Sequence, residues 1–254
     1  MKVLVTGASS GIGRDLAIEF AKKKCDLVLV ARNVERLEEL KKELIEKYKV
    51  KAEYLSIDLS KRENCLELYD KVKDIDVLVN NAGLGDFGEF SETDLIKDFS
   101  IIDTNITSVH ILTKLYLKNM KEKDSGIILN VASIAGFMPG PLMATYYASK
   151  NYVVRLSEAI REELKKAKSN VQISILCPGP VKTNFNNVAN VKFQISSLTS
   201  EYVAKYTVEK LFKNKFYIVP GFTIKIGRVL AKITPSSIVA KVCYYMQKRK
   251  AGKE

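Results

Sequence analysis

A short apolar segment near the start of the chain leads directly into a glycine-rich turn and then into a helix-forming stretch. Val3–Val5 precedes Thr6–Gly13, which reads T-G-A-S-S-G-I-G, and Leu16 and Phe20 then fall on one helical face. Glycines let the backbone approach phosphates closely, and a helix N-terminus offers unpaired N–H groups and a positive dipole end. Gly13 also removes a Cβ where helix and strand must touch. This order predicts a unit able to bind the pyrophosphate of a dinucleotide.

Apolar, β-branched segments alternate with helical patterns along the rest of the chain. We expect strands at 2–6, 26–31, 52–57, 76–80, 126–132, 171–177 and 216–219, and helices at 13–24, 34–47, 62–72, 92–120, 146–167 and 200–212. Such alternation predicts one domain over residues 1–254, with a Rossmann-type, doubly wound α/β fold. Its mainly parallel, seven-stranded sheet should carry helices on both faces, and ligands should bind beyond the carboxyl ends of the strands.

Charge and cysteine usage exclude several kinds of partner. The net charge is +12, but it is scattered over predicted helix faces with no zinc-finger, RNA-binding or basic-zipper pattern, so we expect no nucleic-acid partner. Four cysteines without a Cys-x-x-Cys pair indicate reduced thiols and no metal site. The sequence has no stretch of membrane-spanning length, and a strand at residue 2 leaves no room for a signal peptide, so we expect a cytoplasmic protein.

A tyrosine and a lysine four residues apart form the candidate reactive pair. Tyr146 and Lys150 project from one helical face, after Ser133 at the end of the fifth strand and before the loop that begins at Pro178. The same spacing recurs at Tyr69/Lys73, Tyr206/Lys210 and Tyr244/Lys248, so spacing alone decides nothing. Position distinguishes the Tyr146 pair, and we interpret the other three as exposed helix faces.

These motifs together resemble the short-chain dehydrogenase/reductase family. The matching segments are Thr6–Gly13, Asn80–Gly83, Asn105, Ser133, Tyr146-x-x-x-Lys150 and Pro178–Pro180, within roughly the first 185 residues of a one-domain chain. The resemblance implies a catalytic set of Asn105, Ser133, Tyr146 and Lys150. In that set Ser133 would bond the substrate oxygen, Lys150 would hold the nicotinamide ribose, and Asn105 would support a water relay to Lys150.

The reactive pair suits proton transfer during carbonyl reduction. Reduction places negative charge on the carbonyl oxygen, which must be stabilised and protonated. A free tyrosine has a pKa near 10, and a neighbouring ammonium and a positive nicotinamide would favour its phenolate. We therefore expect the pKa of Tyr146 to be lowered, by about two to three units.

The end of the second strand favours NADP(H). An acid there would bond a ribose 2′-hydroxyl, whereas this chain has Ala31 followed by Arg32, and a guanidinium suits a 2′-phosphate. The alternative is that Arg32 only pairs with Glu35 or Glu39. The cofactor-binding residues that we expect, several of them by resemblance, are Gly7, Ser9, Ser10, Gly11, Ile12, Gly13, Arg32, Asp58, Leu59, Asn80, Ala82, Gly83, Tyr146, Lys150, Pro178, Gly179, Val181 and Thr183.

The substrate and the C-terminal segment are less constrained. Expected substrate contacts are Ser133, Tyr146, Phe137, Met143 and Phe185, which suit an apolar or bulky carbonyl compound, although apolar residues also pack cores. Residues 222–254 carry eight Lys/Arg against one acid, with an apolar stripe at helical spacing that includes Ile238 and Val242. This basic, amphipathic extension is interpreted as a lid or a subunit contact, with weak contact to an acidic membrane surface as the alternative. A homodimer is expected.

The sequence thus predicts an NADP(H)-dependent oxidoreductase that reduces a ketone or aldehyde, or oxidises the corresponding alcohol. One alternative is a catalytically silent NADP(H)-binding regulatory protein, although Asn105, Ser133, Tyr146 and Lys150 are all present. Another is a membrane-surface-associated reductase of ketoacyl or other lipid carbonyl compounds.

Overall fold

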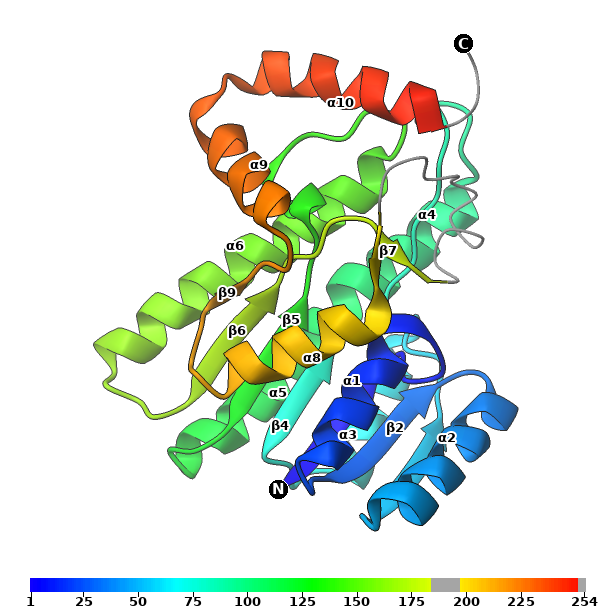
Figure 1. The fold of residues 1–254 in the computed structure, drawn as a ribbon, viewed down its shortest axis with the longest axis vertical. Helices are drawn as coiled ribbons and strands as arrows, with labels where there is room; N and C mark the ends of the chain where they lie inside the picture. Colours follow the sequence, from blue (N-terminus) through cyan, green and yellow to red (C-terminus); the bar gives the residue numbers. More distant parts are fainter. Residues whose placement is uncertain (184–196, 251–254) are drawn as a thin grey trace.

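The centre of the molecule is a seven-stranded, wholly parallel sheet. The computed structural model describes residues 1–183 and 197–250. The strand order is β3-β2-β1-β4-β5-β6-β9 (Figure 1). The strands are β1 (Lys2–Thr6), β2 (Asp26–Ala31), β3 (Ala52–Ser56), β4 (Val77–Asn80), β5 (Ile127–Val131), β6 (Gln172–Leu176) and β9 (Tyr217–Ile218). Each predicted strand is present, and the predicted doubly wound α/β fold is confirmed.

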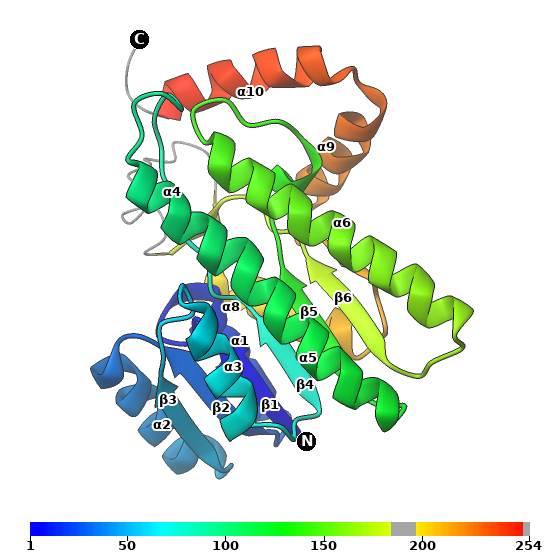
Figure 2. The same cartoon turned by 180° about the vertical axis from the view of Figure 1, so that it is seen from behind.

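Helices cover both faces of this sheet. One face carries α1 (Gly11–Lys22), α2 (Val34–Tyr48) and α8 (Ser200–Leu211), as Figure 1 shows. The other carries α3 (Arg62–Lys71), α5 (Ser108–Glu122) and α6 (Ala144–Lys166) (Figure 2). Phe20 and Leu40 bury themselves on the first face, and Leu112 and Val153 on the second. Because both faces are covered, the central strands carry consecutive apolar residues, such as Val3–Val5 and Val77–Val79, instead of alternating apolar and polar ones.

The predicted helix over residues 92–120 is interrupted. It consists of α4 (Leu95–Ile102), a π-helical turn η1 (Asp103–Thr107) and α5. A π turn inserts an extra residue into the helical repeat and is frequent at functional sites. Asn105 lies inside this turn and is fully buried. The hydrophobic period could not reveal the interruption, because apolar residues continue on both sides of it.

The chain reverses its direction of winding between β1 and β4. From β1 it proceeds outward to β2 and β3, and it then returns to place β4 on the other side of β1. Loops that leave the carboxyl ends of β1 and β4 therefore diverge to opposite faces and open a crevice between them. The polar residues that the sequence places after strands all belong to this edge.

The position of Asn80 differs from its prediction as a cofactor-binding residue. Its Nδ2 donates to Thr113 Oγ1 at 3.0 Å and to Asn130 Oδ1 at 2.9 Å, and its side chain is buried inside the sheet layer. Asn130 Nδ2 in turn donates to Ser157 Oγ at 2.9 Å. This polar network joins β4 and β5 to α5 and α6, so the Asn80 side chain lies in the core and does not contribute to the wall of the cavity described below.

Three shorter elements and two helices complete the carboxyl edge of the sheet. The shorter elements are the 3₁₀ turn η2 (Ile134–Phe137) and a two-residue parallel pairing of β7 (Val181–Lys182) with β8 (Leu198–Thr199), a pairing that the sequence did not predict. The chain ends in α9 (Phe222–Ile233) and α10 (Ser236–Lys250). Both helices lie beyond the carboxyl ends of β5 and β6 (Figure 1).

Candidate active site

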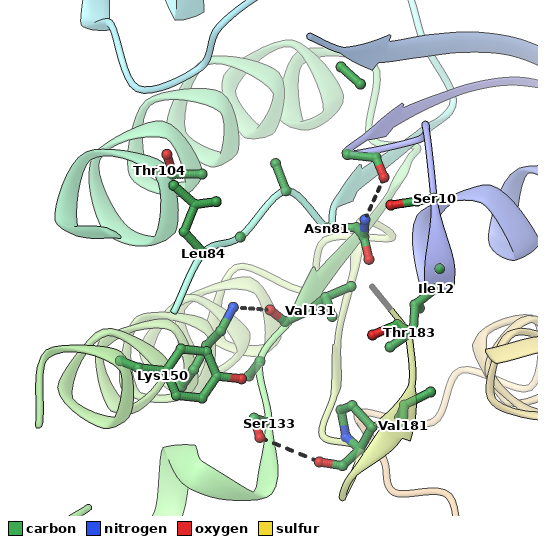
Figure 3. A pocket seen from close by; sticks show the side chains of 18 of the residues that line it. Ser10, Ile12, Asn81, Leu84, Thr104, Val131, Ser133, Lys150, Val181 and Thr183 are labelled. Atoms are coloured by element: carbon green, nitrogen blue, oxygen red, sulfur yellow. Dashed lines mark hydrogen bonds between the residues drawn. The ribbon is translucent and has the colours of Figure 1, made fainter. Parts of the chain in front are cut away.

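A cavity of about 660 Å³ opens at the carboxyl edge of the sheet. Its walls come from the loops that follow β1 to β6, from α6, and from α10. Figure 3 shows part of this wall, including Ser10 and Ile12 of the glycine turn, Asn81, and Ser133 and Lys150. Of the predicted cofactor-binding residues, those that line it are Gly7, Ser9, Ser10, Gly11, Ile12, Arg32, Asp58, Leu59, Ala82, Gly83, Tyr146, Lys150, Pro178, Gly179, Val181 and Thr183. Most of the predicted cofactor-binding residues therefore lie in the cavity wall.

The glycine turn forms one end of the cavity. Gly7 and Gly11 have φ angles of 66° and 54°, which side chains with a Cβ rarely adopt. A Cβ on Gly11 would lie 2.9 Å from Thr183 Cγ2. Ser10 caps α1 with its backbone only, and the first turn of that helix carries no acidic residue. The turn therefore leaves N–H groups and a positive helix end facing the cavity, a donor set that fits a pyrophosphate.

Gly13 does not line the cavity. A Cβ there would overlap Gly7 O and Asn81 Nδ2, so its role is close packing beneath the turn. The sequence predicted that Gly13 allows close packing between helix and strand. The close packing is present, but it is against Gly7 of the turn and against Asn81.

Asn81, which sequence reasoning passed over in favour of Asn80, fixes the turn in place. Its Nδ2 donates to Thr6 O at 2.9 Å and to Gly7 O at 3.2 Å. In return, Thr6 Oγ1 accepts from Asn81 N at 2.9 Å and from Ala82 N at 3.0 Å. These bonds join the ends of β1 and β4. The alternation of side chains in a strand could have shown that two adjacent asparagines must face different surroundings.

Two arginines stand where the second strand ends. Arg32 and Arg36 both line the cavity, and the described residues form no ion pair between Arg32 and Glu35 or Glu39. Burial raises the pKa of the neighbouring Asp58, but hydrogen bonds from Ser60 and the charge of Arg32 outweigh it and hold that pKa below its ordinary value. This end of the cavity thus presents two guanidinium groups beside an ionised carboxylate.

Tyr146, Lys150 and Ser133 meet in the middle of the cavity. Lys150 is 5% exposed, and its Nζ donates to Val131 O at 3.1 Å (Figure 3). The same Nζ lies 5.7 Å from the centre of the Tyr146 ring. The hydroxyl of Ser133 shares a hydrogen bond with Tyr146. Ser133 Oγ also accepts from Ala135 N at 3.2 Å, which anchors it at the start of η2. Ser133 precedes η2 just after β5, and Tyr146 and Lys150 lie in the first turns of α6.

The protonation of this pair differs from the sequence-based expectation. Burial raises the pKa of Tyr146 to about 12, and the hydrogen bond with Ser133 only partly offsets it. Burial also lowers the pKa of Lys150 to about 8. Without a cofactor the pKa of Tyr146 is thus raised by removal from water instead of lowered, whereas the expected fall also invoked a positive nicotinamide. The phenol is held neutral, which is the state that a proton donor needs.

Asn105 joins the loop after β4 to α6 through three hydrogen bonds. Its Oδ1 accepts from Leu84 N at 2.8 Å, while its Nδ2 donates to Leu84 O and to Ser149 Oγ, each at 2.9 Å. A Cβ on Gly83 would lie 3.3 Å from both Asn105 Oδ1 and Lys150 Nζ, so these two groups face each other across Gly83. The π turn thereby connects the loop after β4 to the helix that carries Tyr146.

The predicted substrate residues divide into three groups. Met143 lines the cavity and packs against Tyr146 and Tyr147. Phe137 does not line it, because the ring is buried in the core, 6.0 Å from the ring centre of Tyr217. Phe185 lies outside the described residues. The Phe137 prediction is wrong because the turn η2 directs that ring toward β9.

Two residues of the cavity wall near Met143 were not predicted from the sequence. Gln247 of α10 and Tyr147 both line the cavity, and Gln247 Nε2 donates to Tyr147 Oη at 2.6 Å. Gln247 is 1% exposed, and its Oε1 has no hydrogen-bond partner in the described part of the chain. Sequence pattern could not connect them, because they lie 100 positions apart.

The other Tyr-x-x-x-Lys pairs lie away from the cavity, among the residues that the structure describes. Tyr69 is half-buried, and its Oη donates to Asn119 Oδ1 at 2.6 Å. Tyr206 is also half-buried, with Lys210 Nζ 5.3 Å from its ring centre. The Tyr69 and Tyr206 rings are thus only partly exposed on their helices, and Tyr146/Lys150 is the pair that lines the cavity.

Known proteins resemble this chain in sequence and in fold. It is 34% identical to a very-long-chain 3-oxoacyl-CoA reductase of Anas platyrhynchos over 200 residues, which are 75% of this chain and 62% of that protein. A Sphingobium yanoikuyae short-chain dehydrogenase in complex with NADPH aligns with a TM-score of 0.82 and 25% identity, over 93% of this chain and 97% of that one. A Burkholderia phymatum short chain dehydrogenase/reductase in complex with NAD aligns with a TM-score of 0.82 and 25% identity, over 90% and 92%.

The chain spans about three fifths of the length of the curated relatives that it matches first. The model of one family, the short chain dehydrogenases, matches residues 1–192, well over half of the chain. The protein therefore belongs to the short chain dehydrogenase family.

Proposed function

We propose that this protein is an NADP(H)-dependent reductase of a ketone or aldehyde, able to run in reverse as an alcohol dehydrogenase. The observation that supports this most directly is the grouping of Tyr146 and Ser133 with the buried Lys150 in the cavity beside the glycine turn. A catalytically silent NADP(H)-binding protein is the alternative, but it would not need a neutral phenol beside a buried amine.

The cavity fits a phosphorylated dinucleotide. The glycine turn and the start of α1 would hold the pyrophosphate, Arg32 with Arg36 the 2′-phosphate, and Lys150 the nicotinamide ribose. When bound, NADPH supplies the hydride. Relatives of known structure include complexes with NADPH and with NAD, so the preference rests on the arginines of this chain.

Ser133, Tyr146 and Lys150 have different roles in the transfer of a proton to the substrate. Ser133 donates to the substrate oxygen and holds it against Tyr146, which passes its phenolic proton to that oxygen as negative charge develops. The ammonium of Lys150 stabilises the phenolate that remains. Asn105 positions this group through Ser149 and Leu84, without reaching the reacting atoms.

We propose a 3-oxoacyl thioester as the substrate class. The relatives named very-long-chain 3-oxoacyl-CoA reductase support this class. In this chain, Met143 offers apolar surface and Gln247 Oε1 offers an acceptor without a partner among the described groups. The arm of such a thioester carries amide N–H groups, which would satisfy that acceptor.

The protein should form a homodimer through α4. Leu95, Ile96, Phe99 and Ile102 are exposed on this helix, next to charges of both signs that include Lys97 and Asp103. A mixed-charge apolar face can meet its own copy without like charges repelling.

Replacing Tyr146 by phenylalanine should reduce carbonyl turnover by about a hundredfold or more, because no proton donor remains. NADPH affinity, followed by fluorescence titration, should stay nearly unchanged. Tyr206→Phe is the matched control, since its ring also has a lysine four positions later at a similar distance. Retained activity in Tyr146→Phe would refute its role as proton donor.

Replacing Arg32 by aspartate should weaken NADPH binding by about tenfold to a hundredfold and shift preference toward NADH, because a carboxylate repels the 2′-phosphate. Arg62→Asp, exposed at the start of α3 and outside the cavity wall, makes the same charge change. If both variants lose NADPH affinity equally, or neither does, the phosphate assignment is wrong.

Replacing Gln247 by leucine should raise KM by about tenfold for a 3-oxoacyl thioester of N-acetylcysteamine, which has an amide N–H. The KM for the corresponding ethyl ester, which has none, should stay nearly the same, as should kcat for both. An equal change in KM for the two substrates would contradict the contact with the amide.

A further inference from the structure

The helix α9 turns its apolar face toward solvent. Phe222 and Ile233 are 76% and 74% exposed, and the intervening exposed residues fall on the same face at helical spacing: Ile226, Val229 and Leu230. No residue of this helix is buried. An amphipathic helix of a globular protein normally buries its apolar stripe. This one is oriented the other way.

The opposite side of α9 explains that orientation. The Arg228 guanidinium lies 3.4 Å from the ring centre of Tyr217 and 5.0 Å from that of Phe137. Ile224 packs so closely on Gly179 that a Cβ there would lie 2.5 Å from Ile224 Cδ1. Specific contacts by a cation and one isoleucine therefore hold α9 against the body and fix its apolar stripe outward.

The following helix α10 repeats the arrangement. Ile238, Val242, Tyr245 and Met246 are exposed at helical spacing, whereas Cys243 and Gln247 face inward and are buried. Figures 1 and 2 both show α9 and α10 together at one end of the molecule. We call the nine exposed side chains the α9–α10 apolar surface, formed by Phe222, Ile226, Val229, Leu230, Ile233, Ile238, Val242, Tyr245 and Met246.

The basic residues around the α9–α10 apolar surface indicate which kind of partner it can bind. Residues 222–250 contain no acidic residue and seven basic ones, which are Lys225, Arg228, Lys232, Lys241, Lys248, Arg249 and Lys250. Two copies joined through this segment would bring the basic residues of both together, unlike the mixed charges of α4. Large exposed apolar side chains interspersed with cations match an anionic lipid interface, which takes up the apolar groups and attracts the charges.

We propose that the α9–α10 apolar surface docks this protein on an anionic membrane surface. No helix in residues 1–183 and 197–250 is long and apolar enough to cross a membrane. Because Gln247 of α10 lines the cavity, docking would bring the cavity wall to the lipid interface. Docking does not depend on the proposed reaction, and its test needs no turnover.

The test is co-sedimentation of the full chain with vesicles of phosphatidylcholine alone, or mixed with phosphatidylglycerol. We expect binding to the mixed vesicles and weak binding to the neutral ones. A triple variant Ile226→Gln, Leu230→Gln and Ile233→Gln should bind the mixed vesicles at least about tenfold more weakly, because three apolar groups no longer enter the interface. Its NADPH affinity should match the unaltered protein, which shows that it is folded.

A second triple variant provides the matched control. Val34→Gln, Ile45→Gln and Leu66→Gln removes exposed apolar surface from α2 and α3, away from the proposed dimer contact, and should leave vesicle binding intact. Lys241→Glu with Lys248→Glu should weaken binding, and Lys114→Glu with Lys118→Glu, on exposed positions of α5, should weaken it much less. The proposal is overturned if the unaltered chain ignores anionic vesicles, or if the two triple variants behave alike. It is also overturned if the α9 variant instead converts a dimer to a monomer, which would assign the surface to a second copy.

Discussion

The burial of the Lys150 amine beside the Tyr146 phenol is the constraint on which the site depends. A buried cation is costly unless it is hydrogen-bonded, and Lys150 Nζ donates to the carbonyl of Val131 at the end of β5. That bond forms only if α6 packs against β5. The packing depends on the apolar side chains between the sheet and the face that carries α3, α5 and α6. The polar clamp from Asn105 to Ser149 then sets the helix against the loop after β4. The sheet, the π turn and α6 thus act together to hold one amine next to one phenol.

Both groups respond to the same loss of water in opposite directions. The pKa of the phenol rises to about 12 and that of the amine falls to about 8, so burial disfavours the charged form of each. In the cofactor-free site the phenol therefore keeps its proton, and its raised pKa also makes it a weaker acid than an ordinary tyrosine. A positive nicotinamide in the same cavity would favour the phenolate, so we propose that the cofactor itself changes the site from donor to acceptor.

The sheet could be predicted from sequence because buried parallel strands are short apolar runs, as in Val77–Asn80, and because turns and helices separate them regularly. Residues after strands were also predictable, since parallel strands bring their carboxyl ends to one edge. Prediction failed where a choice depended on side-chain direction. Asn80 and Asn81 are adjacent, yet one joins a core network and the other holds the glycine turn. It failed again for Gln247, whose place in the cavity wall depends on how α10 packs after the last strand.

The central claim is that removal from water keeps the Tyr146 phenol neutral until a cofactor binds. It is tested most directly by ¹³C NMR titration of ring-labelled tyrosines, with the Tyr146 signal assigned from its loss in the phenylalanine variant. In the cofactor-free protein we expect this signal to remain that of a neutral phenol at pH about 11, where an ordinary tyrosine has ionised. Addition of NADP⁺ should lower its midpoint. A midpoint at or below about 10 without cofactor, or no fall with NADP⁺, would contradict the account.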